Sequence, residues 1–120
     1  AKTIYESYEQ FIKSDANYCL GITNFPFPIQ RAISVSDKNR LTMFNQENSH
    51  KRSQDLDEAY HDAGQFYWGR PEAWLKLKPI FNQLSTIINI SRWRAHDIDT
   101  LEDWKQAEII YKSLMKKKYD

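Results

Sequence analysis

The pattern of hydrophobic and polar positions predicts a helix and then a buried strand in the first part of the chain. Residues 3–14 carry apolar side chains at helical spacing, which form one stripe made of Ile4, Tyr8, Phe11 and Ile12. The run YCLGITNF (18–25) is almost continuously apolar and is typical of a buried strand. FPFPIQ (25–30) cannot continue it as a central strand, because its two prolines lack amide donors. We therefore expect a hinge or ledge there.

The middle of the chain predicts a hairpin and then a polar surface segment. RAISVSDKNRLTMFN (31–45) consists of two short strand-like runs around SDKN, whose residues favour tight turns. Residues 46–64 have little to bury and are expected to run over the surface or into a cleft. QFYWG (65–69) then predicts a short aromatic strand.

The last third predicts a short helix, strand material and a final helix. RPEAWLKLKPIF (70–81) places Pro71 in a first helical turn and stops close to Pro79. TIINI (86–90) and RWRAHDID (92–99) are expected to be strands, and Thr100 with Asp103 resembles a capping box. The final helix has an apolar face made of Trp104, Ala107, Ile110, Tyr111, Leu114 and Met115. This alternation, with one antiparallel hairpin inserted, predicts an α/β domain with a mixed sheet.

Length and charge restrict the class of protein. A chain of 120 residues is one domain at most, and its net charge of +1 argues against a nucleic-acid or anionic-membrane partner. The basic run KSLMKKKYD (112–120) is expected to cap a helix end, with a polybasic binding tail as the alternative. Cys19 stands alone and is expected to be a buried, inert thiol. Without a long apolar run or a signal-peptide pattern, we expect a cytoplasmic protein.

Two acidic residues, Asp97 and Asp99, are the first candidate for chemistry. In an extended backbone they point the same way, so both carboxylates can meet one Mg²⁺, which typically takes one or two protein carboxylates beside water and phosphate oxygens. Such a pair suits a nucleotide-dependent transferase. The alternative is that one aspartate caps the following helix while the other is solvated.

The second candidate is the polar segment that leads into the aromatic strand. It gathers side chains that can bind carboxylates, hydroxyls and amides, namely Arg52, Gln54, His61, Asp62, Gln65 and Tyr67. Taken alone, these residues equally suit a solvated loop. The three histidines are too scattered to specify a metal site, and no glycine-rich phosphate loop occurs.

Four motifs, in order along almost the whole chain, carry a family resemblance. FPFPIQRA, RSQDLDEAYHDAGQFYWG, PEAW and RWRAHDIDTLEDWKQAE resemble the C-terminal half of pseudaminic acid cytidylyltransferases, relatives of the CMP-sialic acid synthetases. The resemblance implies a bacterial, Mg²⁺-dependent enzyme that activates a nonulosonic acid with CTP, giving the CMP-sugar and pyrophosphate. It implies catalytic, metal-binding roles for Asp97 and Asp99. It also implies that residues 31–80 include the sugar-binding and dimerisation segment, with sugar contacts from Arg52, Gln54, His61, Asp62, Gln65 and Tyr67.

The resemblance also implies a fold and a partner. The family fold is a Rossmann-like, nucleotide-diphosphosugar-transferase-type mixed sheet with an inserted dimerisation element, for which the hairpin at 31–45 and the helix near Trp74 are candidates. Residues 1–120 would be its C-terminal portion, because the CTP-binding loop that opens the family is absent. The chain alone is expected to be inactive and to dimerise through its exposed sheet edge and apolar surface.

Two questions stay open in this interpretation, namely which sugar is bound and whether the chain has a catalytic role. Where sialic acid synthetases commonly have an asparagine before the glycine, this chain has Ala63, which favours the pseudaminic branch, although the exact sugar stays open. The alternative function is a stand-alone, non-catalytic interaction or assembly module with the same fold. In that case, Asp97 and Asp99 would be helix-capping residues only.

Overall fold

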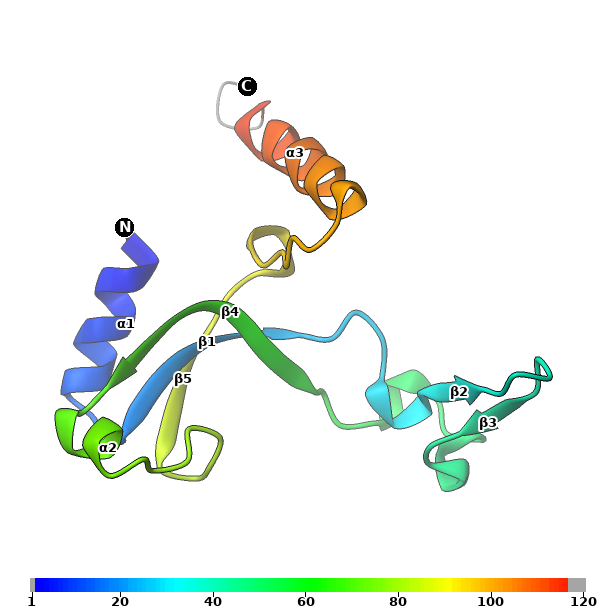
Figure 1. The fold of residues 1–120 in the computed structure, drawn as a ribbon, viewed down its shortest axis with the longest axis horizontal. Helices are drawn as coiled ribbons and strands as arrows, with labels where there is room; N and C mark the ends of the chain where they lie inside the picture. Colours follow the sequence, from blue (N-terminus) through cyan, green and yellow to red (C-terminus); the bar gives the residue numbers. More distant parts are fainter. Residues whose placement is uncertain (1, 117–120) are drawn as a thin grey trace. The chain divides into compact units, whose positions relative to one another are not determined.

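The computed structural model describes residues 2–116, which form two compact units. Among the described residues, one unit combines 2–23 with 62–116, and the other is 24–61. Each is described by itself below (Figure 1).

A three-stranded sheet forms the centre of the larger unit, with β1 (Tyr18–Asn24) between β4 (Tyr60–Gly69) and β5 (Ser85–Asn89). β1 and β5 are parallel, in a register that pairs Tyr18 with Ser85. The Arg70 amide, just after β4, donates to the Asn17 carbonyl, just before β1, at 2.9 Å. The Phe25 amide, just after β1, donates to the Ala59 carbonyl, just before β4, at 3.0 Å, so β1 and β4 are antiparallel. The predicted mixed sheet is confirmed (Figure 1).

Helix α1 (Lys2–Ile12) packs on β5 and β4 through polar anchors as well as apolar contacts. The Gln10 side-chain amide donates to the Ile87 carbonyl at 3.0 Å, and the Trp68 indole N–H donates to Ser7 Oγ at 2.9 Å. Of the predicted stripe only Phe11 is buried, whereas the other members keep 41–46% of their surface exposed. The helix is therefore confirmed, but most of its apolar stripe is only partly covered within the described residues, as where the Tyr8 ring meets that of Trp68 at 5.1 Å.

The core of the larger unit surrounds Cys19, the second residue of β1. Phe11 and Ala16 are buried against it, with Trp68 packed beside them. Burial raises the pKa of the Cys19 thiol by desolvation, as expected for an inert cysteine. Arg70 closes the cluster, because its guanidinium lies 5.2 Å from the Phe11 ring centre and donates to the Ala16 carbonyl at 2.9 Å.

Helix α2 (Pro71–Leu75) is short, with Pro71 in its first turn as predicted. Its Trp74 ring meets Tyr18 edge-on at 4.8 Å between centroids. The same ring fills the space beside Gly69, where a Cβ atom would lie 2.8 Å from Trp74 Cζ2. Gly69 is therefore required by the close approach of the tryptophan at the end of β4.

The smaller unit contains the predicted hairpin, formed by β2 (Ile33–Val35) and β3 (Leu41–Met43) in antiparallel register. Its turn is closed by the Ser36 amide donating to the Arg40 carbonyl at 2.9 Å, with Asn39 in the left-handed region at φ 54°. Three single turns of 3₁₀ helix complete the unit, at Ile29–Arg31, Gln46–Asn48 and Ser53–Asp55. Most of its 46–61 segment is exposed, as predicted.

The prediction of a strand over residues 92–99 is wrong. Arg92–Arg94 forms a 3₁₀ turn, with the Arg94 amide donating to the Ser91 carbonyl at 2.8 Å, and residues 95–99 have no regular structure. The reason is that residues 92–99 have no neighbouring strand to pair with. The last hydrogen bond between the end of β5 and β1 is the one from the Ile90 amide to the Ile22 carbonyl, at 2.7 Å. β4, predicted as 65–69, is longer than expected and begins at Tyr60.

The final helix α3 (Leu101–Lys116) is confirmed, but none of its residues is buried. Its apolar face is exposed by up to 60% at Tyr111 and 56% at Trp104. Residues 117–120 of the predicted basic capping run lie outside the described residues. None of the described helices is both long and apolar enough to cross a membrane.

Candidate functional site

Asp97 and Asp99 lie in the irregular segment between the Arg92–Arg94 turn and α3, and both side chains are exposed. We expected a strand that points both carboxylates the same way, and this strand is absent. The two aspartates are therefore related only by lying two positions apart in sequence. Within residues 2–116, neither carboxylate is recorded in a hydrogen bond or salt bridge. Both therefore keep the lone pairs that a cation would need.

The helix cap of α3 is made by Asp103 and not by Asp99. The Asp103 carboxylate accepts from the Thr100 amide at 2.8 Å and from the Thr100 hydroxyl at 2.6 Å, and Thr100 Oγ1 accepts from the Asp103 amide at 3.2 Å. These hydrogen bonds lower the pKa of Asp103. The capping box predicted from sequence is confirmed, and capping therefore does not account for the Asp97 and Asp99 carboxylates.

The donor set at this segment suits magnesium better than zinc. The part of the chain that the structure describes holds no group of three or more His, Cys, Asp and Glu side chains able to bind a metal. Magnesium needs only one or two carboxylates when water and substrate phosphates supply its other ligands. Two accessible carboxylates therefore fit Mg²⁺, with Asp97 and Asp99 as its candidate protein ligands.

Arg52 and Gln54 lie at and inside the 3₁₀ turn Ser53–Asp55 of the smaller unit. The Arg52 guanidinium makes a bidentate contact with the Asp55 carboxylate, at 2.7 Å and 3.0 Å. This hydrogen bonding raises the pKa of Arg52, so its charge is retained. The fork predicted to bind a ligand carboxylate therefore already holds an internal one, which a ligand would have to exchange.

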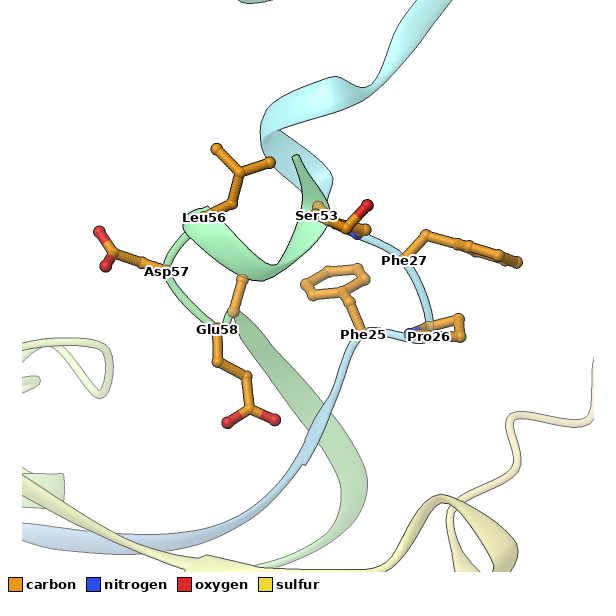
Figure 2. A pocket seen from close by; sticks show the side chains of 9 residues that line it. Phe25, Pro26, Phe27, Ser53, Leu56, Asp57 and Glu58 are labelled. Carbon is orange, nitrogen blue, oxygen red and sulfur yellow. The ribbon is translucent and has the colours of Figure 1, made fainter. Parts of the chain in front are cut away.

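A pocket of about 180 Å³ adjoins this turn and was missed by the sequence reading. The Phe25 ring faces Ser53 across it, while the Asp57 and Glu58 carboxylates point outward (Figure 2). The other lining residues come from the two ends of the unit and are Pro26, Phe27, Pro28, Leu56 and Ala59. One feature of the sequence could have indicated this pocket. The prolines of FPFPIQ (25–30) and the RSQDL segment (52–56) both stand next to polar residues that were candidates for ligand binding.

Glu58 is held at the rim of the pocket by two donors. Asn24 Nδ2 reaches Glu58 Oε1 at 3.2 Å, and the Tyr60 hydroxyl reaches Glu58 Oε2 at 2.7 Å. His61, another predicted site residue, packs its ring 4.7 Å from that of Phe25. Arg52, Gln54 and His61 do not line the pocket themselves, although His61 contacts its Phe25 wall and the other two flank Ser53 in sequence.

In the larger unit, Asp62, Gln65 and Tyr67 cluster around a kink in β4. Gly64 adopts φ 63°, a left-handed conformation, and its amide donates to Asp62 Oδ1 at 2.8 Å. The Tyr67 hydroxyl donates to the other carboxylate oxygen of Asp62, and this bond raises the pKa of Tyr67. The Gln65 side-chain amide donates to the Arg94 carbonyl. The structure therefore joins Asp62 to Tyr67, and Gln65 to the segment that leads to Asp97.

Comparison with known proteins gives relatives of one kind. No family model matches the chain. The chain is 41% identical over 107 residues to "Pseudaminic acid cytidylyltransferase" of Campylobacter jejuni serotype O:2, covering 89% of this chain and 46% of that protein. The serotype O:23/36 protein of the same name gives the same figures.

A longer Helicobacter pylori protein matches over a shorter stretch. It is named "Pseudaminic acid cytidylyltransferase and UDP-2,4-diacetamido-2,4,6-trideoxy-beta-L-altropyranose hydrolase" and is 38% identical over 73 residues, which cover 61% of this chain and 14% of that protein. The chain spans about half the length of the Campylobacter relatives, at 46% of each. By sequence, this chain is similar to these two pseudaminic acid cytidylyltransferases over 89% of its own length.

Proposed function

We propose that this chain is the sugar-binding and metal-contributing part of a cytidylyltransferase that activates a nonulosonic acid, namely pseudaminic acid, with CTP. The observation that carries the proposal is the 41% identity to proteins of that name over 89% of the chain. The accessible Asp97 and Asp99 carboxylates support it, because phosphate chemistry commonly needs hard oxygen ligands for magnesium. The CTP loop would come from the part of such a protein that lies outside the matched region.

The reaction joins the sugar to the nucleotide at the α-phosphorus of CTP. The anomeric hydroxyl oxygen forms the new bond to phosphorus and loses its proton, while the bond to the β-phosphate oxygen breaks and pyrophosphate leaves. Bound Mg²⁺ would offset the negative charge of the triphosphate. Asp97 and Asp99 would hold that ion, and the Thr100–Asp103 cap keeps the end of their segment attached to α3.

The smaller unit offers contacts for both ends of an acidic sugar. Arg52 would exchange Asp55 for the sugar carboxylate, a like-for-like replacement of one bidentate carboxylate by another. Gln54 is exposed beside it and can bind a hydroxyl. The slot formed by Phe25 and Leu56 would take an apolar substituent of the sugar. Tyr67 of the larger unit is a separate candidate for a sugar contact, as the family resemblance implies.

Pyrophosphate release by the longest natural protein that contains this chain tests the proposal, with CTP, Mg²⁺ and pseudaminic acid as substrates. We expect turnover, and we expect Asp97→Asn to lower it by about a hundredfold or more, because a metal-held charge is lost where phosphate charge must be offset. Asp15→Asn, exposed in the loop between α1 and β1, is the matched control and keeps full activity. Unchanged activity of Asp97→Asn across a Mg²⁺ titration would remove Asp97 from the metal site.

A non-catalytic interaction module is the second candidate, favoured by the exposed apolar face of α3. The same assay separates the two functions. Absence of pyrophosphate release from that longest natural protein, with pseudaminic, legionaminic and sialic acids each supplied, would favour the module.

A further inference from the structure

The segment that carries Asp97 and Asp99 is connected to the rest of the larger unit by few long-range hydrogen bonds within the described residues. It is irregular, and the hydrogen bonds at Arg94 N–H, Ala95 N–H and the His96 ring are to residues within three positions along the chain. Such local bonds shape a turn but do not attach it to the sheet. Attachment must come from side chains or backbone groups distant in sequence.

Two long-range hydrogen bonds supply this attachment within residues 2–116, and both involve Arg94. The Arg94 guanidinium donates to Thr3 Oγ1 on α1 at 3.0 Å. The Gln65 side-chain amide, from β4, donates to the Arg94 carbonyl. Gln65 therefore connects the sheet to the backbone of the turn, three residues before Asp97.

The position of Gln65 is itself set by the β4 kink. Gly64 precedes it at φ 63°, with its amide bonded to Asp62 at 2.8 Å, so the strand changes direction immediately before the glutamine. A side chain at this point reaches toward residue 94 only while the kink persists. Asp62, Gly64 and Gln65 thus form one unit of local structure.

We propose that Gln65 is a positioning residue, not a sugar contact: its amide holds the Arg94 carbonyl and thereby orders the backbone that presents Asp97 and Asp99. The functional part of this inference rests on the proposed cytidylyltransferase activity, whereas the structural part does not. Gln65 would make the metal-binding carboxylates depend on the strand that carries Tyr67. A mobile acidic pair binds a cation less well, because ordering it costs conformational entropy.

Backbone dynamics of the 120-residue chain test the structural part directly. We would measure ¹⁵N order parameters for residues 95–99 in the native chain and in Gln65→Glu, which keeps the side-chain shape but removes the N–H donor. We expect the values to fall from about 0.85 toward 0.6 in Gln65→Glu, while those of β1 stay constant. Gln83→Ala, an exposed glutamine in the turn before β5, is the control and leaves residues 95–99 unchanged.

Activity then tests the consequence, in the longest natural protein that contains the chain. We expect Gln65→Glu and Gln65→Ala to raise the Mg²⁺ concentration needed for half-maximal rate by about fivefold to tenfold, because losing one hydrogen bond has an effect of about this size. We expect the KM for the sugar to stay unchanged. Unchanged order parameters would overturn the inference, as would a rise in the sugar KM with an unchanged Mg²⁺ requirement. Failure of the proposed function appears differently, as absence of turnover in the unmutated protein.

Discussion

At the residue scale, Asp62 combines two tasks through its two carboxylate oxygens. One accepts from the Gly64 amide at 2.8 Å and the other from the Tyr67 hydroxyl. The first bond supports a backbone conformation that glycine adopts readily, and the second fixes where the tyrosine hydroxyl points. A single side chain thereby links the shape of β4 to the direction of a candidate sugar-binding group.

The pKa of Tyr67 should report this contact. Because the pKa of Tyr67 is raised in the folded state, its hydrogen bond contributes fully to the stability of the folded protein below the usual value of 10.0. That contribution is lost as pH rises through the higher folded-state pKa. In Asp62→Asn we expect the Tyr67 pKa to move down toward 10.0, because the hydrogen bond to the carboxylate is lost and, with it, the negative charge that opposed phenolate formation.

A ¹³C chemical-shift titration of the tyrosine ring carbons measures this change. Tyr60, whose pKa is raised by its hydrogen bond to Glu58, is the internal control and should keep that raised pKa in both proteins. A Tyr67 pKa that does not move in Asp62→Asn would contradict the role given to Asp62.

At the element scale, α3 depends on its cap more than on packing. None of its residues is buried, so tertiary contacts add little to its stability. The Thr100–Asp103 box satisfies amides of the first turn that otherwise lack partners. On the side of α3, the order of the segment that ends in Asp99 therefore depends on this capping box.

Acid should release the first turn of α3. Because hydrogen bonds lower the folded-state pKa of Asp103, its stabilising effect is present above the usual value of 3.8 and is lost as pH falls through the lower folded value. We expect the Cα chemical shifts of residues 101–104 to lose helical character below that range.

The matched pair of variants is Asp103→Asn and Glu102→Gln, since both acids lie in the first turn. Asp103→Asn should remove the acid transition, and Glu102→Gln should keep it. Thr100→Ala should lower the stability of α3 by about 1 kcal/mol at neutral pH. An acid transition that persists in Asp103→Asn would assign it to another group.

At the scale of the whole molecule, exposed apolar surface is the dominant feature of the described residues. It includes the α3 face, with Leu101 exposed by 83%, and the hairpin unit, with Phe44 exposed by 71%. β4 and β5 are edge strands of their sheet. Surfaces of this kind are normally covered, either by more of the same chain or by another molecule.

We expect the 120-residue chain in isolation to form dimers or larger species. Multi-angle light scattering measures this, and a monomer across the accessible concentration range would contradict it. Trp104→Glu should weaken association, because it places a charge on the exposed apolar face of α3. Lys105→Glu, one position along on the same helix, is the control for the added negative charge.

Local chemistry in the sequence was sufficient for most of the elements. The apolar run of β1, the SDKN turn, Pro71 at the start of α2 and the Thr100–Asp103 box each act within a few residues, so their outcome follows from nearby side chains. The buried state of Cys19 followed in the same way from its apolar neighbours.

Long-range pairing settled the remaining features, and the site depends mostly on these. Residues 92–99 look strand-like but have no strand to pair with beyond Ile90, and β4 begins at Tyr60 because its partner β1 extends far enough to bond it. Gln65 holds the Arg94 carbonyl, 29 residues along the chain, and no residue pattern specifies that pairing. The sequence alone could identify the residue types suited to the chemistry, but their partners depend on which backbone and side-chain groups the folded chain brings within hydrogen-bonding distance.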